Sequence, residues 1–229
     1  MEIMEGHIYK AFDMELRELK EKLLLEGGMV EKAIQNAINA LLERKSELAE
    51  KVIENDHVVN AKEIEIDEFC LKLLALRQPA ARDLRFITTA IKVNYDLERI
   101  GDLAVNICER VLELNKEPQL KPYIDIPTMS GLVQLMLKES LDAFVREDVE
   151  LASKVAREDE KVDQLHDQIF RELLTYMMQD LRTISRATRV LFVSKYLERI
   201  ADHAVNIAEL VIFMTQGKII RHTRSLPEE

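Results

Sequence analysis

The sequence contains no tryptophan, few aromatic residues and few of the residues that interrupt helices. Its 229 residues include six glycines, five prolines and 5% aromatic side chains. Because glycine and proline mark turns and helix ends, their scarcity favours a small number of long helices. The two cysteines, Cys70 and Cys108, are far apart and form no CxxC pair, which excludes a disulfide framework and a thiolate zinc site.

Long apolar runs and an excess of positive charge are also missing. No run approaches the ~20 apolar residues that a membrane span needs. The first ten residues, MEIMEGHIYK, lack the basic and apolar regions of a secretory signal, so none is expected. With 42 acidic and 32 basic residues, the formal net charge is −10. This charge argues against nucleic-acid binding, and other proteins or cations are the expected partners in a reducing cytoplasm.

A segment of thirteen residues occurs twice. Leu97–Glu109 (LERIGDLAVNICE) returns 100 residues later as Leu197–Glu209 (LERIADHAVNIAE), with ten identical positions. On a helix, the acidic and amide residues of each copy share one face, and the apolar residues lie opposite. The retained polar pairs are Glu98/Glu198, Asp102/Asp202, Asn106/Asn206 and Glu109/Glu209. A merely solvated face would exchange such residues freely, so this stripe is the candidate functional surface.

Three of the five prolines fall within Asn115–Pro127, which predicts a connecting segment between two similar halves. Each half has three stretches of helical periodicity and no convincing strand pattern. The predicted helices cover residues 7–43, 46–76, 79–114, 128–146, 148–180 and 183–215. We expect an all-α fold of two tandem, pseudo-symmetric three-helix bundles at 1–115 and 128–217. A proline-rich linker at 116–127 joins them, and a flexible tail is expected at 218–229.

Several residues predict where helices begin and end. Gly27 and Gly28 interrupt the first pattern, but we expect one continuous helix through them. Ser46 and Asp148 are predicted to cap the helices that follow them. Pro79 is predicted to lie in the first turn of a helix, and Gly217 to end the last one.

A second acidic line runs along the middle helix of each predicted bundle. In the first half it consists of Asp56, Asn60, Glu63 and Asp67, and in the second half of Asp159, Asp163, His166 and Asp167. If the middle and last helices are neighbours, the two lines of carboxylates repel one another unless they are protonated, paired or bridged by a cation. Oxygen ligands with an occasional imidazole suit Mg, Ca, Mn, Fe or Zn. The candidate metal ligands are Asp56, Glu98, Asp102, Asp159, Asp163, Glu198 and Asp202.

A solvated, ion-paired surface is the alternative interpretation of both stripes. The arginines that could neutralise them are Arg99, Arg110 and Arg199. The first half offers the weaker metal site, because it has Asn60 where the second half has Asp163. It also has Leu103 where the second half has His203.

No catalytic constellation is evident. The sequence has neither a glycine-rich phosphate loop nor a nucleophile elbow, and we do not expect His166 or His203 to act as catalytic bases. The single ExxH that starts at Glu54 lies off the apolar face and lacks the second ExxH of an interior di-iron centre. Arg85 and Arg182 recur at the start of the third helix of each half, where either an anion or a local ion pair would suit them.

The doubled LERIxDxAVNI(C/A)E segment, each copy ending the third helix of a repeated bundle, closely resembles the PhoU family of phosphate-signalling proteins. The resemblance extends from the first helix to about Gly217. It implies a cytoplasmic, non-enzymatic adaptor that restrains the phosphate-starvation response. The implied partners are the ATPase subunit of the phosphate ABC transporter and the membrane histidine kinase that controls phosphate genes. A homodimer is also among the expectations.

Some members of this family carry multinuclear iron or zinc clusters on E/DxxxD motifs. By position, the ligands that the resemblance implies in the first half are Glu98, Asp102, Asp56 and the less suitable Asn60. Those that it implies in the second half are Glu198, Asp202, Asp159 and Asp163. The competing interpretations are a metal-storage protein or metalloenzyme, and a plain helical scaffold whose acidic faces serve for docking.

Overall fold

Six long helices make up the fold. The computed structural model describes residues 2–217, with side chains from Lys10 onward. The helices are α1 (Glu2–Glu43), α2 (Ser46–Arg77), α3 (Ala81–Leu114), α4 (Asp125–Arg146), α5 (Val149–Gln179) and α6 (Ile184–Gln216), and the 3-10 turn η1 (Leu181–Thr183) precedes α6. No strand occurs among the described residues, so the predicted all-α fold of two three-helix bundles is confirmed. The tail predicted at 218–229 lies outside the described residues.

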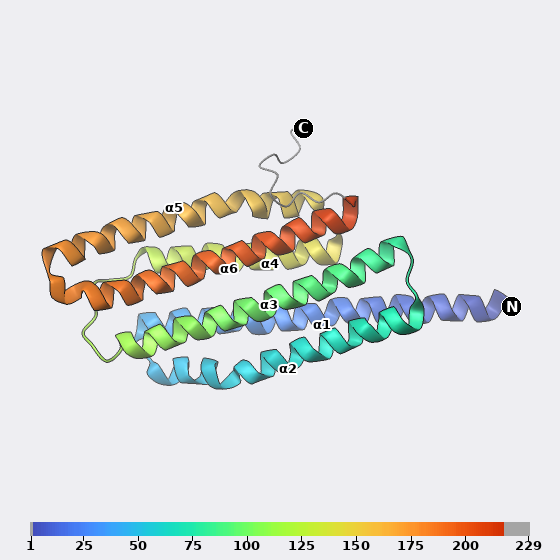
Figure 1. The fold of residues 1–229 in the computed structure, drawn as a ribbon, viewed down its shortest axis with the longest axis horizontal. Helices are drawn as coiled ribbons and strands as arrows, with labels where there is room; N and C mark the ends of the chain where they lie inside the picture. The colour runs from blue at the N-terminus through green and yellow to red at the C-terminus, as the bar shows by residue number, and fades with distance from the viewer. Residues whose placement is uncertain (1, 218–229) are drawn as a thin grey trace.

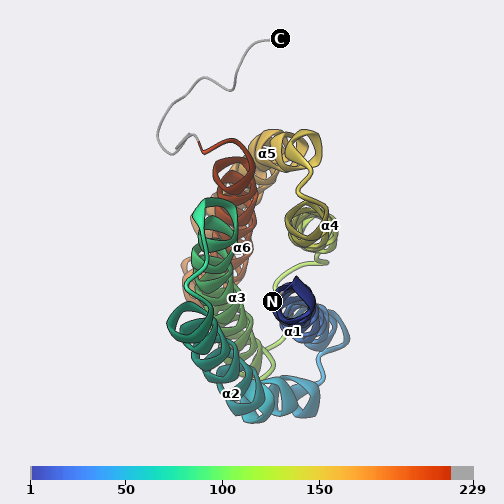
Figure 2. The same ribbon diagram turned by 90° about the vertical axis from the view of Figure 1, so that its right-hand side faces the viewer.

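The two three-helix halves lie side by side along their length (Figure 1). Within each half, the third helix packs against the other two: α3 against α1 and α2, and α6 against α4 and α5. The halves meet where α3 packs against α6 and where α1 contacts α4. Seen along the helices, the six form a flattened ring in which α3 and α6 are neighbours (Figure 2). The two helices that carry the repeated segment therefore run next to each other.

The apolar positions of the repeat form part of a core that is shared by both halves. Ile100 and Ile107 on α3, and their equivalents Ile200 and Ile207 on α6, are fully buried. Burial of these positions leaves the acidic stripe of each helix to face its partner helix and solvent. Within residues 2–217, no helix combines the length and apolar character that crossing a membrane requires.

The helix ends follow some of the predicted signals. Asp148 caps α5 as predicted, because its side chain accepts a hydrogen bond of 3.0 Å from the backbone N–H of Leu151. Gly217 ends α6 as predicted, with a left-handed φ of 70°. The prediction for Ser46 is wrong, since it is already the first residue of α2 and caps nothing. Its hydroxyl instead accepts a hydrogen bond of 3.1 Å from the side-chain amide of Asn115.

Two proline positions also differ from expectation. Pro79 precedes α3, which begins at Ala81, because Gln78 ends α2 in a left-handed conformation and the chain then runs extended. Conversely, α4 begins at Asp125, before the predicted start at residue 128. Pro127 thus lies in the first turn of α4, where its missing N–H breaks no helical hydrogen bond.

The connection from α3 to α4 is held by the turn between α1 and α2. The guanidinium of Arg44 in that turn donates to the carbonyl oxygens of Leu114, Asn115 and Glu117 at 3.4, 3.1 and 2.6 Å. The last carbonyls of a helix have no partner within the helix, so Arg44 acts as a cap for α3. The proline-rich connection is thereby attached to the first half.

Gly27 and Gly28 lie within the continuous helix α1, as predicted, but their surroundings differ. A Cβ at Gly27 would lie 2.3 Å from Cδ1 of Leu141 on α4, whereas a Cβ at Gly28 would meet nothing within 4 Å. We expect Gly28→Ala to increase the free energy of unfolding by about 1 kcal/mol. Gly27→Ala should decrease it by about 1–3 kcal/mol, because the buried Leu141 must move. Chemical denaturation of the two variants measures both effects.

Shortening Leu141 provides the control for this prediction. The double variant Gly27→Ala with Leu141→Ala should be less destabilised than the sum of the two single changes, because the shorter side chain leaves room for the added methyl. If Gly27→Ala proved as stable as Gly28→Ala, the close approach of α1 and α4 at this position would be refuted.

Candidate functional site

The four acidic residues predicted as ligands in the second half lie together between α5 and α6. Burial, followed by the charges of Asp163, Asp202 and Glu198, raises the pKa of Asp159 to about 6. The pKa values of Asp163 and Asp202 are also raised, first by burial and then by the charge of Glu198. Each carboxylate therefore interacts with the others across the two helices, which brings the two predicted acidic lines together.

Positive charge near this cluster only partly balances it. Lys195 forms an ion pair with Glu198 one turn away on α6. The charges of His166 and Lys195 lower the pKa of Asp163, and those of Lys195 and His203 lower the pKa of Asp202, but the effects that raise both pKa values are larger. The four carboxylates therefore retain an excess of negative charge, which a bound cation or protons would relieve.

The first half brings together Asp56, Glu98 and Asp102, but here neighbouring side chains neutralise more of the negative charge. Burial, followed by the charge of Asp102, raises the pKa of Glu98, and the charge of Asp56 contributes less. Arg99 forms ion pairs with Asp102 at 2.9 Å and with Glu98 at 3.3 Å. The side-chain amide of Asn60 donates a 2.9 Å hydrogen bond to Asp56. The ion-paired alternative therefore accounts for part of this half.

The two histidines near the second cluster have protein partners. Nδ1 of His166 lies 3.1 Å from the hydroxyl oxygen of Ser194. Nδ1 of His203 lies 2.7 Å from Oδ1 of Asp96, whose side chain is 7% exposed. Because Asp96 is on α3 and His203 on α6, this contact joins the two halves of the molecule.

Both acidic clusters contain buried carboxylate oxygens. Oδ1 of Asp159 accepts no hydrogen bond, whereas Oε2 of Glu98 and Oε2 of Glu198 are paired with Arg99 and Lys195. An oxygen that accepts no hydrogen bond is suited to bind a hard cation, so the oxygen ligands of these clusters fit such an ion. Among residues 2–217, no three His, Cys, Asp or Glu side chains are already grouped closely enough to hold one. Binding would therefore require carboxylates of neighbouring helices to turn towards a common point.

Sequence reasoning missed Glu26, a carboxylate inside the first half on α1. Its exposed fraction is 0%, and neither carboxylate oxygen has a hydrogen-bond partner. Burial, followed by the charge of Glu63, raises the pKa of Glu26 to about 8. The sequence did carry a signal, because Glu26 lies at helical spacing between the core residues Leu23 and Val30. An acid on the apolar face of a helix marks an unusual interior position.

The arginines that recur in both halves make local contacts. Arg182 forms an ion pair with Asp180 at 3.0 Å, which is the local pair considered from the sequence. Nε of Arg85 donates a hydrogen bond of 3.4 Å to the backbone carbonyl of Met214 at the end of α6. Both guanidinium groups therefore contact protein atoms in this structure.

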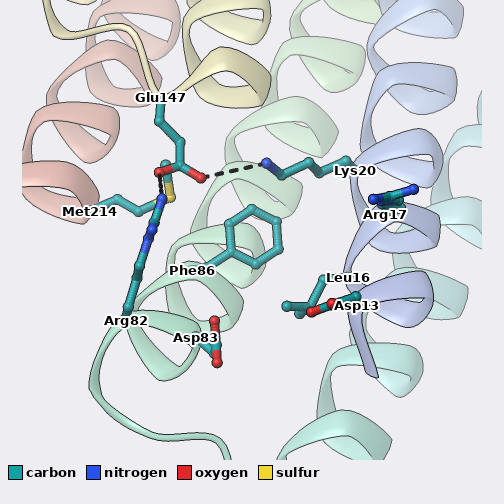
Figure 3. A pocket seen from close by; sticks show the side chains of 9 residues that line it. All are labelled: Asp13, Leu16, Arg17, Lys20, Arg82, Asp83, Phe86, Glu147 and Met214. Atoms are coloured by element: carbon teal, nitrogen blue, oxygen red, sulfur yellow. Dashed lines mark hydrogen bonds and ion pairs between the residues drawn. The ribbon is translucent and has the colours of Figure 1, made fainter. Parts of the chain in front are cut away.

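A pocket of about 260 Å³ lies away from both acidic clusters, where α1, α3 and α6 meet the turn between α4 and α5 (Figure 3). Glu147 in that turn pairs with Arg82 at 2.6 Å and with Lys20 at 3.6 Å. The charged residues that line the pocket are Asp13, Asp83, Glu147, Arg17, Lys20 and Arg82. Acids and bases are equal in number, so the pocket has no net charge to favour an anion or a cation.

Comparison with known proteins places the chain in a family. The PhoU domain matches residues 23–111 and again residues 126–211. A "Phosphate-specific transport system accessory protein PhoU homolog" of Pseudomonas aeruginosa is 45% identical over 217 residues, which cover 94% of this chain and 90% of the relative. The Escherichia coli (strain K12) protein of the same description, without "homolog", is 40% identical over 219 residues, or 96% of this chain and 91% of the relative.

Solved structures agree with these sequence relatives. The crystal structure of PhoU from Pseudomonas aeruginosa has a TM-score of 0.86 and 45% identity, and the match covers 90% of this chain and 100% of that one. The phosphate transport system regulatory protein PhoU from Streptococcus pneumoniae has a TM-score of 0.85 and 35% identity, over 91% and 98% of the two chains. Since both halves match the domain and the relatives align over nearly the whole length, the chain belongs to the PhoU family.

Proposed function

We propose that this protein is an accessory protein of a phosphate-specific transport system, and that it regulates negatively without catalysing a reaction. The observation that carries this proposal is the whole-length match, over 96% of the chain, to an Escherichia coli protein with that description. The described residues add long helical faces suited to protein contacts. The proposed role is to restrain phosphate uptake and the phosphate-starvation response.

The proposed partners are the ATPase subunit of the phosphate ABC transporter and the phosphate-sensing histidine kinase, which this protein would contact from the cytoplasm. To transmit a signal, the protein must bind one state of the kinase more tightly than the other, because equal affinity shifts no equilibrium. The state of the transporter would then set how much of the protein is available to the kinase.

Deleting the gene tests this role directly. Expression of phosphate-regulated genes should rise in phosphate-rich medium, and a plasmid copy of the wild-type gene should restore repression. A pull-down with the tagged protein should retain the transporter ATPase and the kinase. Unchanged expression in the deletion strain would refute the regulatory role.

We further propose that the acidic clusters bind metal ions, with iron or zinc favoured by the family resemblance and Mg, Ca or Mn also suited to the oxygen ligands. The residues that would hold them are Glu98, Asp102, Asp56, Glu198, Asp202, Asp159 and Asp163. A bound ion would supply positive charge that bridges carboxylates on neighbouring helices. The unpartnered oxygen of Asp159 and the excess negative charge around it support the second half as the stronger site.

The double variant Asp159→Asn with Asp163→Asn tests the second cluster. Because the pKa of Asp159 is raised from 3.8 to about 6, its ionisation removes stability as the pH rises between these values. Without metal, the free energy of unfolding of the variant should therefore be about 1–2 kcal/mol higher than that of the wild type at pH 8. This difference should vanish near pH 4. The variant should also lose the part of the metal-induced rise in melting temperature that comes from the second cluster. Thermal unfolding with and without added metal measures both.

Glu160→Gln on the exposed side of α5 is the matched control, since it removes one acid from the same helix outside the cluster. It should keep the metal-induced rise in melting temperature. An equal metal response in the control and in the double variant would count against a cluster of ligands between α5 and α6.

A further inference from the structure

Glu26 has no role in the acidic stripes, yet among the described residues it is the carboxylate with both oxygens buried and without a hydrogen-bond partner. It is fully buried on α1, and both of its oxygens lack a hydrogen-bond donor. A carboxylate that has left water without gaining a donor is unstable in its charged form. Such a group holds either a proton or a cation, because no hydrogen-bond donor compensates the charge.

The charged neighbours of Glu26 come from the two other helices of the first half. The carboxylates that act on it are Glu63 and Asp67 of α2 and Glu98 of α3, and the lysine that acts on it is Lys62. Lys62 is itself engaged in an ion pair with Glu65, whose side chain is partly exposed. Carboxylates of α2 and α3 thus act on the carboxylate of α1, and the lysine that acts on it is paired with Glu65.

The same region contains a further acceptor oxygen without a donor. Asn94 of α3 is fully buried, and its side-chain amide donates to the backbone carbonyl of Glu63 at 2.9 Å and to Asp67 at 3.2 Å. Its own Oδ1 has no partner. An interior with several acceptors and no spare donor matches the ligand preferences of a hard cation.

The second half carries no acid at the equivalent position. Gly28 aligns with Gly131 in the repeat, so Glu26 corresponds to Met129, a fully buried core residue. The acid at residue 26 is therefore not required by the fold, since the repeated fold accommodates methionine there. The first half is also the one in which Asn60 takes the place of an acid on α2.

We propose that Glu26 is the interior ligand of a divalent cation of the Mg²⁺ or Mn²⁺ class, held together with Glu63 of α2 and Glu98 of α3. The inference rests on the proposed metal binding and extends it to a ligand on α1, outside the doubled motif. Glu63 and Glu98 are partly exposed, so they can turn inward, whereas Glu26 is held in place by the core. Its raised pKa is that of the ion-free state, in which a proton takes the place of the cation.

Titration with Mn²⁺ tests the proposal on the full chain after treatment with a chelator. Calorimetry at pH 7.5 compares the wild type with Glu26→Met and Glu26→Gln, and with Asp159→Asn/Asp163→Asn as the matched change in the other half. We expect both Glu26 variants to lose one Mn²⁺ equivalent, or to bind it at least about tenfold more weakly. The Asp159/Asp163 variant should keep that equivalent.

Thermal unfolding supplies a second measurement. Added Mn²⁺ should raise the melting temperature of the wild type more than that of Glu26→Met, although the metal-free variant is the more stable of the two. If wild type and Glu26→Met bind the same number of ions with the same affinity, Glu26 holds only a proton and the inference is overturned. If only the Asp159/Asp163 variant loses ions, this inference fails while the proposed metal site of the second half stands. Absence of Mn²⁺ binding by every form would overturn both.

Discussion

Replacing Glu26 with methionine should raise the free energy of unfolding of the metal-free protein by about 2–4 kcal/mol at pH 7.5. The ordinary pKa of this carboxyl is 4.5, and burial is the main reason that it rises to about 8 in the folded protein. Between these values the folded state retains a proton that the unfolded state releases. Wild-type stability therefore falls as the pH rises from about 4.5 to 8, whereas methionine has no proton to bind. Urea denaturation at several pH values measures the difference.

The pH dependence separates this effect from ordinary repacking. The advantage of Glu26→Met over wild type should be small at pH 4.5, grow through neutral pH and stop growing above pH 8. Glu26→Gln should gain less at high pH, because its buried amide still lacks hydrogen-bond partners. A difference between Glu26→Met and wild type that is the same at every pH would rule out a buried, titrating carboxyl.

Replacing Phe144 with alanine should lower the free energy of unfolding by about 3–5 kcal/mol. Phe144 on α4 is the largest of the fully buried side chains, and its ring stacks on Phe86 of α3 with the centroids 5.4 Å apart. The pair connects the two halves, so the loss of the ring removes core volume and a contact between them. Chemical denaturation gives the change in free energy. We expect a single transition, because the core is continuous across both halves.

Two controls define what the Phe144 result means. Phe192 is 45% exposed and stacks on Tyr196, so Phe192→Ala should cost less than about 1 kcal/mol. A double-mutant cycle of Phe86→Leu and Phe144→Leu should show a coupling of about 0.5–1.5 kcal/mol. Two separate unfolding transitions in Phe144→Ala, or no coupling in the cycle, would show that the halves are stabilised independently.

The helical periodicity and the repeat were sufficient to predict the fold class. A stripe such as Ile100, Ile107 and their equivalents buries one face of each helix, and this requires only local spacing. Helix boundaries were less accurate where the decisive contact is remote in sequence. Ser46 looked like a cap, but its hydroxyl bonds Asn115 at the far end of the half. No local pattern contains that partner.

For the candidate ligands, the sequence predicted which residues share a face of a single helix, but not which charged groups of other residues neutralise them. Spacing placed Glu198 and Asp202 on one face, and Asp159 and Asp163 on another, and the structure brings these faces together. Whether neighbouring cations neutralise such faces depends on side-chain contacts, as Arg99 shows in the first half. The sequence carried a signal for Glu26 that was overlooked, but its burial depends on packing by three helices.

The amino-acid sequence alone was enough to establish six amphipathic helices, a duplicated unit and two acidic stripes, because these depend on residue spacing along single helices. Tertiary packing settled which faces meet: α3 against α6, Gly27 against Leu141, His203 against Asp96, and Glu26 in an interior without donors. The physical reason is the distance along the sequence between the interacting residues. Helix formation and amphipathicity are local properties, whereas the desolvation of a charge and the pairing of two carboxylates depend on groups that only the folded chain brings together.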